Sequence, residues 1–129
     1  MVRYLRPPWI LAKVINPLVM RFGPATTLCV PTRATGRTQR LPVNVLETGG
    51  RRYLVSVRGD TEWARNLRAS GSCELRRRGW VQRFTAVEVP PNERQPLIAK
   101  YRSRWDSQVN RYFAELPDPA DHPVFELTT

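Results

Sequence analysis

The feature that most constrains the fold is a pair of alternating segments joined by a glycine-containing turn. The segment RLPVNVLE at residues 40–47 places on one side Leu41, Val43 and Val45. The segment RRYLVSVR at residues 51–58 places on one side Tyr53, Val55 and Val57. Alternation with a period of two predicts half-buried strands, and Thr48–Gly50 would close them into a hairpin. Pro42 has no amide hydrogen, so the first strand is expected at a sheet edge or a bulge.

Other segments predict further strands and two helices around this hairpin. Residues 26–33 and 122–127 are expected to be strands, and residues 73–90 a second hairpin that turns near Arg78 and Gly79. Asp60 or Thr61 is expected to cap a helix that Gly71 ends. A further helix is expected over residues 91–104, capped by Asn92. Successive antiparallel hairpins with an inserted helix predict a small closed barrel and argue against a doubly wound parallel sheet.

Positive charge is concentrated in the first two thirds of the chain. Of the net +10, residues 1–32 carry +4 (four basic, no acidic) and residues 33–83 carry +8 (twelve basic, four acidic). Residues 84–129 carry −2 (five basic, seven acidic). This distribution points to an anionic partner such as nucleic acid, a membrane surface or a phosphorylated small molecule.

The first 22 residues form a separate unit in the sequence. Apolar residues recur at helical spacing over residues 9–22, interrupted by Lys13, so the segment is expected to be an amphipathic helix rather than a transmembrane one. Either the helix packs on the domain, or Trp9 and its aliphatic neighbours enter a membrane interface. We therefore divide the 129 residues into a helix at 1–22 and one folded domain at 23–129.

Cysteine and histidine are too few for several kinds of site. Cys29 and Cys73 are the only cysteines, and their apolar surroundings predict reduced core residues rather than a disulfide framework. With His122 as the single histidine, a His-rich metal site is not available. A Ser-His-acid triad would have to use His122. We expect no metal site.

Four stretches are candidate binding sites, each with a purely structural alternative. The turn with Arg33, Gly36, Arg37 and Arg40 suits an anion, since arginine offers fork-shaped donors, but it also fits a solvated turn. Arg58 and Gly59 precede a helix N-terminus, which also attracts anions, but Asp60 can itself satisfy that helix end.

The other two stretches contain aromatic residues. Trp63 and Asn66 either line a pocket or belong to the core and the helix end. The basic run at residues 76–78, near Trp80 and Arg83, resembles a nucleic-acid surface, or is a solvated hairpin tip.

Taken together, these stretches resemble the deazaflavin-dependent nitroreductase family of actinobacteria. The family pattern is an arginine turn, a strand with proline, a strand that ends in a basic residue and glycine, and Trp-x-x-Asn-Leu on a helix. The matching positions are Arg33, Thr35, Gly36, Arg37, Pro42, Arg58, Gly59, Trp63, Asn66 and Leu67. The resemblance covers about residues 15 to 105, and "HPVFEL" near the end also matches.

The resemblance implies an α+β fold, a mainly antiparallel split β-barrel like that of FMN-binding proteins, with flanking helices. It implies the coenzyme F-420, an 8-hydroxy-5-deazaflavin with a phosphate and an oligoglutamate tail; FMN is the alternative. Arg33, Arg37, Arg40 and Arg58 would then pair with phosphate or glutamates.

The same resemblance assigns the remaining site residues. The ring would lie against two backbone stretches, Pro42, Val43 and Asn44 in one and Val57, Arg58 and Gly59 in the other. Trp63 and Asn66 would support the phosphate-binding loop. Three aromatic residues would line the acceptor side, namely Tyr101, Trp105 and Tyr112. The sequence departs from the family pattern at Ala34 and Gln39, where basic residues are frequent, and at Asp60.

Three functions follow as hypotheses. The first is an oxidoreductase that passes hydride from a reduced deazaflavin coenzyme to a small hydrophobic acceptor, quinone-like or nitro-like. The second is a non-catalytic cofactor- or lipid-binding barrel at a membrane surface. The third is a basic nucleic-acid-binding barrel. For the first, the expected state is a monomer or homodimer in the cytoplasm, with contact to the inner face of the membrane as a further expectation.

Overall fold

The structure is a computed structural model that describes residues 26–129. The predicted helix over residues 1–22 lies outside the described residues. The strands are β1 Thr27–Pro31, β2 Thr38–Pro42, β3 Leu46–Thr48, β4 Arg51–Val55, β5 Ser72–Arg77, β6 Trp80–Glu88 and β7 Val124–Thr128. The helices are α1 Glu62–Ser70 and α2 Gln95–Glu115, with short 3-10 turns η2 Pro91–Glu93 and η3 Pro119–Asp121.

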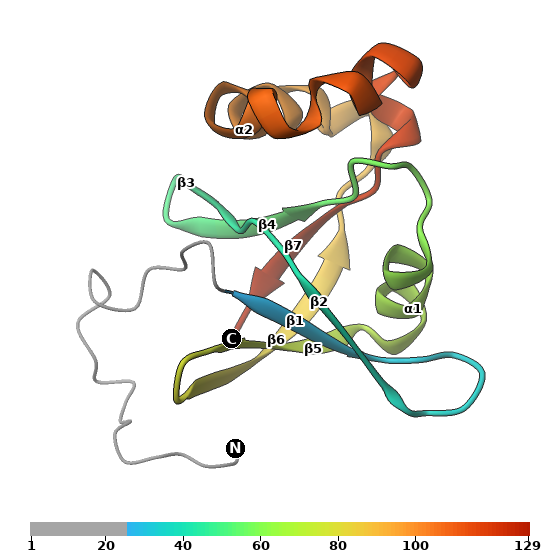
Figure 1. Cartoon of the computed structure of the whole chain (residues 1–129), viewed down its shortest axis with the longest axis vertical. Coiled ribbons are helices and arrows are strands. Elements are labelled where there is room, and N and C mark those ends of the chain that lie inside the picture. Colours follow the sequence, from blue (N-terminus) through green and yellow to red (C-terminus); the bar gives the residue numbers. More distant parts are fainter. Residues whose placement is uncertain (1–25) are drawn as a thin grey trace.

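The strands form one antiparallel seven-stranded sheet in the order β2-β1-β5-β6-β7-β4-β3. Its two edge strands, β2 and β3, are consecutive in the chain, so the segment between them joins the two edges of a sheet that curls on itself (Figure 1). This is the predicted antiparallel split β-barrel. The turn at Thr48–Gly50 and the turn near Gly79 close hairpins as predicted.

The prediction of one continuous strand over residues 40–47 is wrong. The segment is a strand to Pro42, has no strand conformation at 43–45, and resumes as β3 at Leu46. Pro42 has no amide hydrogen with which to continue a ladder, and the Val43 amide donates to the Thr26 carbonyl at 3.1 Å. Past this point the chain pairs with β4 instead of β1. The expected edge position of Pro42 is confirmed.

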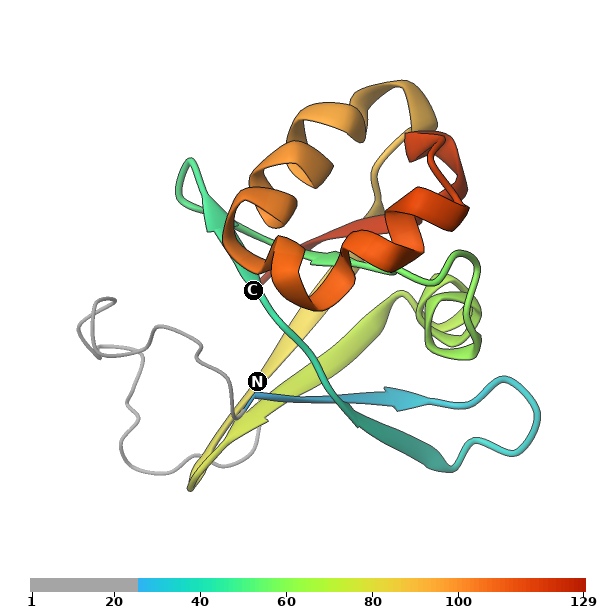
Figure 2. The same ribbon diagram turned by 45° about the horizontal axis from the view of Figure 1, so that its top comes forward.

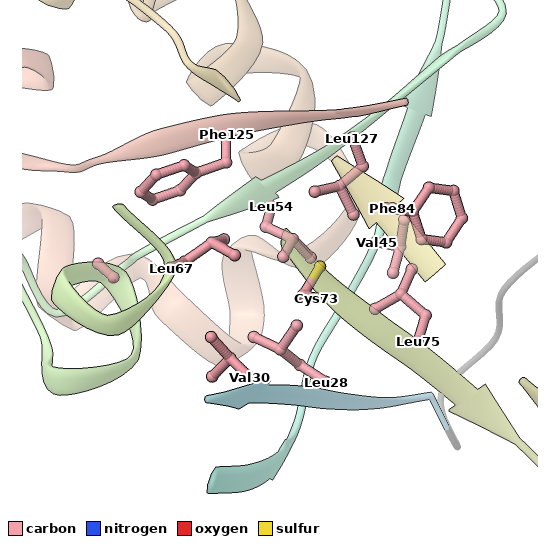
Figure 3. Close-up of a cluster of buried hydrophobic side chains, with 11 residues drawn as sticks. Leu28, Val30, Val45, Leu54, Leu67, Cys73, Leu75, Phe84, Phe125 and Leu127 are labelled. Atoms are coloured by element: carbon pink, nitrogen blue, oxygen red, sulfur yellow. The ribbon is translucent and has the colours of Figure 1, made fainter. Parts of the chain in front are cut away.

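Helix α1 closes one end of the barrel interior. Thr61 is its N-cap, accepting from the Ala64 amide at 3.4 Å, and Gly71 ends it with φ 70°. This settles the choice between Asp60 and Thr61, since the hydroxyl of Thr61 is the capping group. The buried residues inside the curled sheet and on the inner side of α1 form one cluster, which we call the barrel core (Figure 3). Its members are Leu28, Val30, Val45, Leu54, Ala64, Leu67, Cys73, Leu75, Phe84, Phe125 and Leu127.

Helix α2 covers the outer face of β3, β4 and β7 (Figures 1 and 2). A second cluster of buried residues, the α2 core, fills this contact: Leu46, Tyr53, Val55, Val89, Ile98, Tyr101, Val109, Phe113 and Val124. Tyr53 and Val55 point into it and Leu54 points into the barrel core, as strand alternation requires.

The prediction for α2 was wrong at both ends. The cap is Arg94, because Asn92 lies within the preceding 3-10 turn. The helix runs to Glu115 rather than to 104, through a kink at Trp105 (φ −127°, ψ 20°) that is visible in Figure 2. Val109 and Phe113 recur four residues apart and bury the second half of α2, which is why the chain stays helical beyond the kink.

The two cysteines are free and buried, as predicted. Burial raises the pKa of the Cys73 thiol to about 12, so it is an unreactive core residue. Over residues 26–129, no helix is long and apolar enough to cross a membrane.

Candidate functional site

The β1–β2 turn is held closed by its own backbone. The Thr32 amide donates to the Arg37 carbonyl at 2.7 Å, and the Gly36 amide donates to the Thr32 carbonyl at 3.1 Å. The Arg37 amide donates to the Thr35 hydroxyl at 3.2 Å. Gly36 has φ 75°, a conformation that favours glycine. The amides of Thr32, Gly36 and Arg37 are therefore already used and are not available to an anion at this turn.

Arg33 and Asn66 fasten the turn to α1. The Asn66 side-chain oxygen accepts from the Arg33 amide at 3.1 Å and from its guanidinium at 3.0 Å. The Asn66 nitrogen donates to the Gln39 side chain at 2.8 Å. Arg33 also pairs with the Glu62 carboxylate at 3.1 Å. Asn66 is therefore a buried connector, and the charge of Arg33 is largely neutralised.

Arg37 and Arg40 are the two arginines of this region with free charges. Within residues 26–129, no carboxylate or hydrogen-bond acceptor contacts either guanidinium. Both side chains are exposed, and Arg40 lies on the outer face of β2 because its neighbour Leu41 packs against the barrel core. The uncompensated positive charge of the turn is therefore at these two residues.

The connection from β4 to α1 is a compact loop built around Ser56 and Gly59. The buried Ser56 hydroxyl donates to the Gly59 carbonyl at 2.5 Å and lies 2.8 Å from the Thr61 hydroxyl. Gly59 has φ 98°, and a Cβ there would stand 3.1 Å from Cδ2 of Leu116. Glycine at 59 suits both the positive φ and the close approach of Leu116, the C-cap of α2.

Asp60 pairs with two arginines of α1. Its carboxylate accepts from Arg65 at 3.3 Å and from Arg68 at 3.1 Å. Burial opposes ionisation of Asp60, but hydrogen bonds from Arg68 and Arg65 outweigh it and lower the pKa. The departure from the family pattern at Asp60 therefore does not neutralise Arg58.

Of the three aromatic residues predicted for the acceptor side, all in α2, Tyr101 and Tyr112 contact these loops. The Asn44 amide donates to the Tyr101 hydroxyl at 3.2 Å, and the Tyr101 ring packs against the Trp105 ring, with centroids 4.7 Å apart and planes tilted by 49°. Burial raises the pKa of Tyr101, although the Asn44 hydrogen bond acts in the opposite direction. Asn44 also reaches Gln108 at 3.4 Å, a contact that the sequence analysis missed.

Tyr112 is clamped by two arginines. Its hydroxyl accepts from Arg111 at 2.9 Å and from Arg58 at 2.9 Å. Both guanidinium groups also lie over the ring, at 4.8 and 5.0 Å from its centroid. The hydrogen bond from Arg111, and then that from Arg58, lowers the pKa of Tyr112. Arg111 was not predicted; the sequence signal for it is its place next to an aromatic residue on a helix.

The structure thus brings the predicted residues together in two groups. One contains Arg33 and Asn66, together with Gln39, which was noted only as a departure from the family pattern, and Glu62, which the sequence analysis missed. The other joins both predicted ring-backing loops to the predicted acceptor side, through Asn44 with Tyr101 and Arg58 with Tyr112. Trp63 belongs to neither group: it packs on the barrel core, 6.2 Å from the Phe125 ring.

Two other predicted features have structural roles. Trp80 packs against the barrel core, so the basic hairpin does not present a row of aromatic residues. Arg76 of the same hairpin pairs with Glu74 at 2.9 Å. His122 is completely buried between backbone carbonyls and the Phe113 ring, 4.3 Å away, which does not fit a catalytic triad. Residues 26–129 contain no group of three His, Cys, Asp or Glu residues that could hold a metal ion.

Comparison with known proteins identifies the family of this chain. The family model for F420H(2)-dependent quinone reductase matches residues 12–115. An F420-H2-dependent reductase has a similar structure, with 19% identity, a TM-score of 0.61 and coverage of 81% of this chain and 94% of that one. A domain-swapped dimer matches with 20% identity, a TM-score of 0.59 and coverage of 81% and 80%.

A further F420 reductase has 15% identity, a TM-score of 0.52 and coverage of 79% of this chain and 82% of that one. At these identities the three structures establish the split-barrel fold. No curated protein matches the sequence. The family model spans most of the chain, including both ring-backing loops and the aromatic residues of α2. The chain therefore belongs to the F420H(2)-dependent quinone reductase family and is an oxidoreductase that uses the deazaflavin coenzyme F-420.

Proposed function

We propose that this oxidoreductase passes hydride from the reduced deazaflavin coenzyme to a small hydrophobic acceptor of the quinone class, in a site between the β1–β2 turn, the two ring-backing loops and α2. The observation that carries the proposal is the pair of hydrogen bonds across this site, Asn44 to Tyr101 and Arg58 to Tyr112. Each joins a loop expected to back the ring to an aromatic residue expected to face the acceptor.

The anionic end of the coenzyme would be bound at the β1–β2 turn. Its phosphate and glutamates need cationic donors, and the free guanidinium groups of Arg37 and Arg40 fit this requirement. Arg33 would act indirectly, because it is already paired with Glu62 and Asn66. The role of Asn66 would be to hold the turn against α1.

The ring would lie near the backbone of residues 42–44 and 57–59. The bound coenzyme supplies the hydride, so the chain has no need of a covalent catalyst. The chain's own contribution would be to orient ring and acceptor and to exclude water. Tyr101 and Trp105 offer a pair of tilted aromatic rings that suits an aromatic acceptor. The charges around Tyr112 would favour the negative charge that hydride transfer places on the acceptor oxygen.

The proposal is tested by anaerobic stopped-flow kinetics of reduced coenzyme with the quinone menadione. We expect Arg58→Ala to lower kcat/KM about tenfold, since it removes a charged group at the acceptor side. The matched control is Arg83→Ala, an exposed residue of β6 that lies opposite Glu74 of β5, outside the part of β6 that pairs with β7. Equal rates for both variants would contradict the site, and an unreactive menadione with normal coenzyme binding would contradict the acceptor class.

A homodimer is suggested by the related domain-swapped dimer. Location in the cytoplasm and contact with a membrane stay predictions. For the lipid-binding and nucleic-acid-binding alternatives, we found no observation in residues 26–129 that favours either over the enzyme.

A further inference from the structure

His122 contacts two elements of the proposed site, the β4–α1 loop and the end of α2. None of the roles proposed above involves His122. Its side chain is completely buried. Nε2 lies 2.6 Å from the Leu116 carbonyl oxygen, and Nδ1 lies 3.3 Å from the Ser56 carbonyl oxygen. Ser56 begins the β4–α1 loop and Leu116 is the C-cap of α2, so one imidazole touches both elements.

The shorter contact fixes the direction of the hydrogen bond. A carbonyl oxygen only accepts, so Nε2 carries a hydrogen and donates it to Leu116; the tautomer follows from this partner. The last carbonyls of a helix have no partner within the helix. His122 supplies one to Leu116, while the Ser56 carbonyl already accepts from the Gly59 amide at 3.3 Å.

This tether continues to Tyr112. The Leu116 amide donates to the Tyr112 carbonyl at 2.9 Å, one helical turn earlier. The Leu116 side chain also packs so closely on Gly59 that a Cβ there would stand 3.1 Å away. A shift of the end of α2 would therefore change the position of Tyr112 relative to Arg58, which donates to its hydroxyl.

We propose that His122 is a positioning residue of the site: its Nε2 hydrogen bond to Leu116 holds the end of α2 against residues 56–59 and so sets the Arg58–Tyr112 contact. The catalytic consequence rests on the function proposed above. The tether itself does not, so it needs a readout that is independent of turnover.

Two variants of His122 separate the hydrogen bond from the packing. His122→Gln keeps a nitrogen donor at a similar reach. His122→Phe keeps a ring against Phe113 but removes the donor, and it leaves the Leu116 carbonyl without its partner. If His122→Phe does not fold, His122→Asn replaces it, because its amide is too short to reach Leu116.

The first readout is fluorine NMR of protein labelled with 3-fluorotyrosine, with the Tyr112 signal assigned from Tyr112→Phe. We expect the Tyr112 signal to move in His122→Phe and to stay in place in His122→Gln. The second readout is menadione kinetics, where we expect KM to rise about fivefold in His122→Phe, with kcat and the coenzyme Kd nearly unchanged, and near-normal values in His122→Gln.

An unmoved Tyr112 signal in His122→Phe, or equal displacement in both variants, would overturn the proposal. So would a normal menadione KM in His122→Phe. If the wild-type protein does not reduce menadione, the proposed acceptor fails, and the fluorine spectra alone decide whether His122 positions Tyr112.

Discussion

The barrel core and the α2 core differ in the groups they bury, and the difference separates scaffold from site. The described members of the barrel core are aliphatic residues, phenylalanine and Cys73, with two half-buried tryptophans at its margin. The α2 core and its margin include three tyrosines and Trp105. Its polar contacts, from Asn44, Arg58 and His122, all reach residues of α2 or its cap. The apolar barrel core stabilises the fold. The α2 core also contains tyrosine hydroxyl groups, whose hydrogen bonds would orient side chains for binding.

The same leucine truncation in the two regions tests this comparison with the largest expected effect. Leu75 is completely buried in the barrel core, and Leu97 is half-buried beside the α2 core. We expect Leu75→Ala to lower the free energy of unfolding by about 3 kcal/mol, because it leaves a cavity, and Leu97→Ala by about 1 kcal/mol. Urea denaturation measures both. Equal losses would remove the distinction between the two cores.

A second test concerns the close contact between the β4–α1 loop and α2. Gly59→Ala imposes both a positive φ and a Cβ 3.1 Å from Leu116, whereas Gly79→Ala imposes a positive φ alone, since nothing lies within 4 Å. We expect thermal unfolding to show a loss of about 2 kcal/mol for Gly59→Ala and about 1 kcal/mol for Gly79→Ala. Only Gly59→Ala should also weaken menadione turnover. Matching losses would mean that α2 readily moves away from Gly59.

The smallest effect is expected for acid stability at Glu88. Arg68 donates to both Glu88 oxygens, at 2.6 and 2.9 Å, and Arg94 adds a contact at 3.0 Å. The hydrogen bonds from Arg68 hold the pKa of Glu88 below its ordinary value, despite partial burial. Because the folded-state pKa is the lower one, this stabilisation is present above about pH 5 and is lost as the pH falls through the folded-state pKa.

Replacing the Glu88 carboxylate should therefore reduce the loss of unfolding free energy between pH 7 and pH 3. We expect Glu88→Gln to destabilise the protein by about 1 kcal/mol at pH 7 and by less at pH 3. The control is Glu93→Gln, an exposed residue without an ion pair in the described part of the chain. A loss for Glu88→Gln that is the same at both pH values would exclude the ionic contribution.

The sequence alone was sufficient to predict those strands and helices whose signals lie within their own residues. Alternation and glycine turns predict the β3–β4 and β5–β6 hairpins, and Thr61 and Gly71 predict α1, because each signal lies within the element it defines. The break after Pro42 was missed, since alternation continues through residues 43–45 while the pairing partner changes. The pairing partner of a strand is a tertiary property.

The second half of α2 and part of the site were missed for a similar reason. The kink at Trp105 interrupts the helical spacing, although the spacing of Val109 and Phe113 was a usable signal. Some of the residues assigned to the site by family resemblance lie in two connected groups, whereas Trp63 packs on the barrel core. Glu62, which neutralises Arg33, and His122, which tethers α2, depend on contacts between distant segments and have no local signature.

The measurement that tests the account most directly is a fluorescence titration with oxidised coenzyme F-420 at two salt concentrations, beside FMN. It compares wild type with Arg37→Ala and with Arg78→Ala, a change of another exposed arginine at the β5–β6 turn. We expect saturable binding that is tighter than that of FMN. Arg37→Ala should weaken it about tenfold at low salt and less at high salt, and Arg78→Ala should leave it unchanged. Equal affinities for all three proteins would contradict a coenzyme site at the β1–β2 turn.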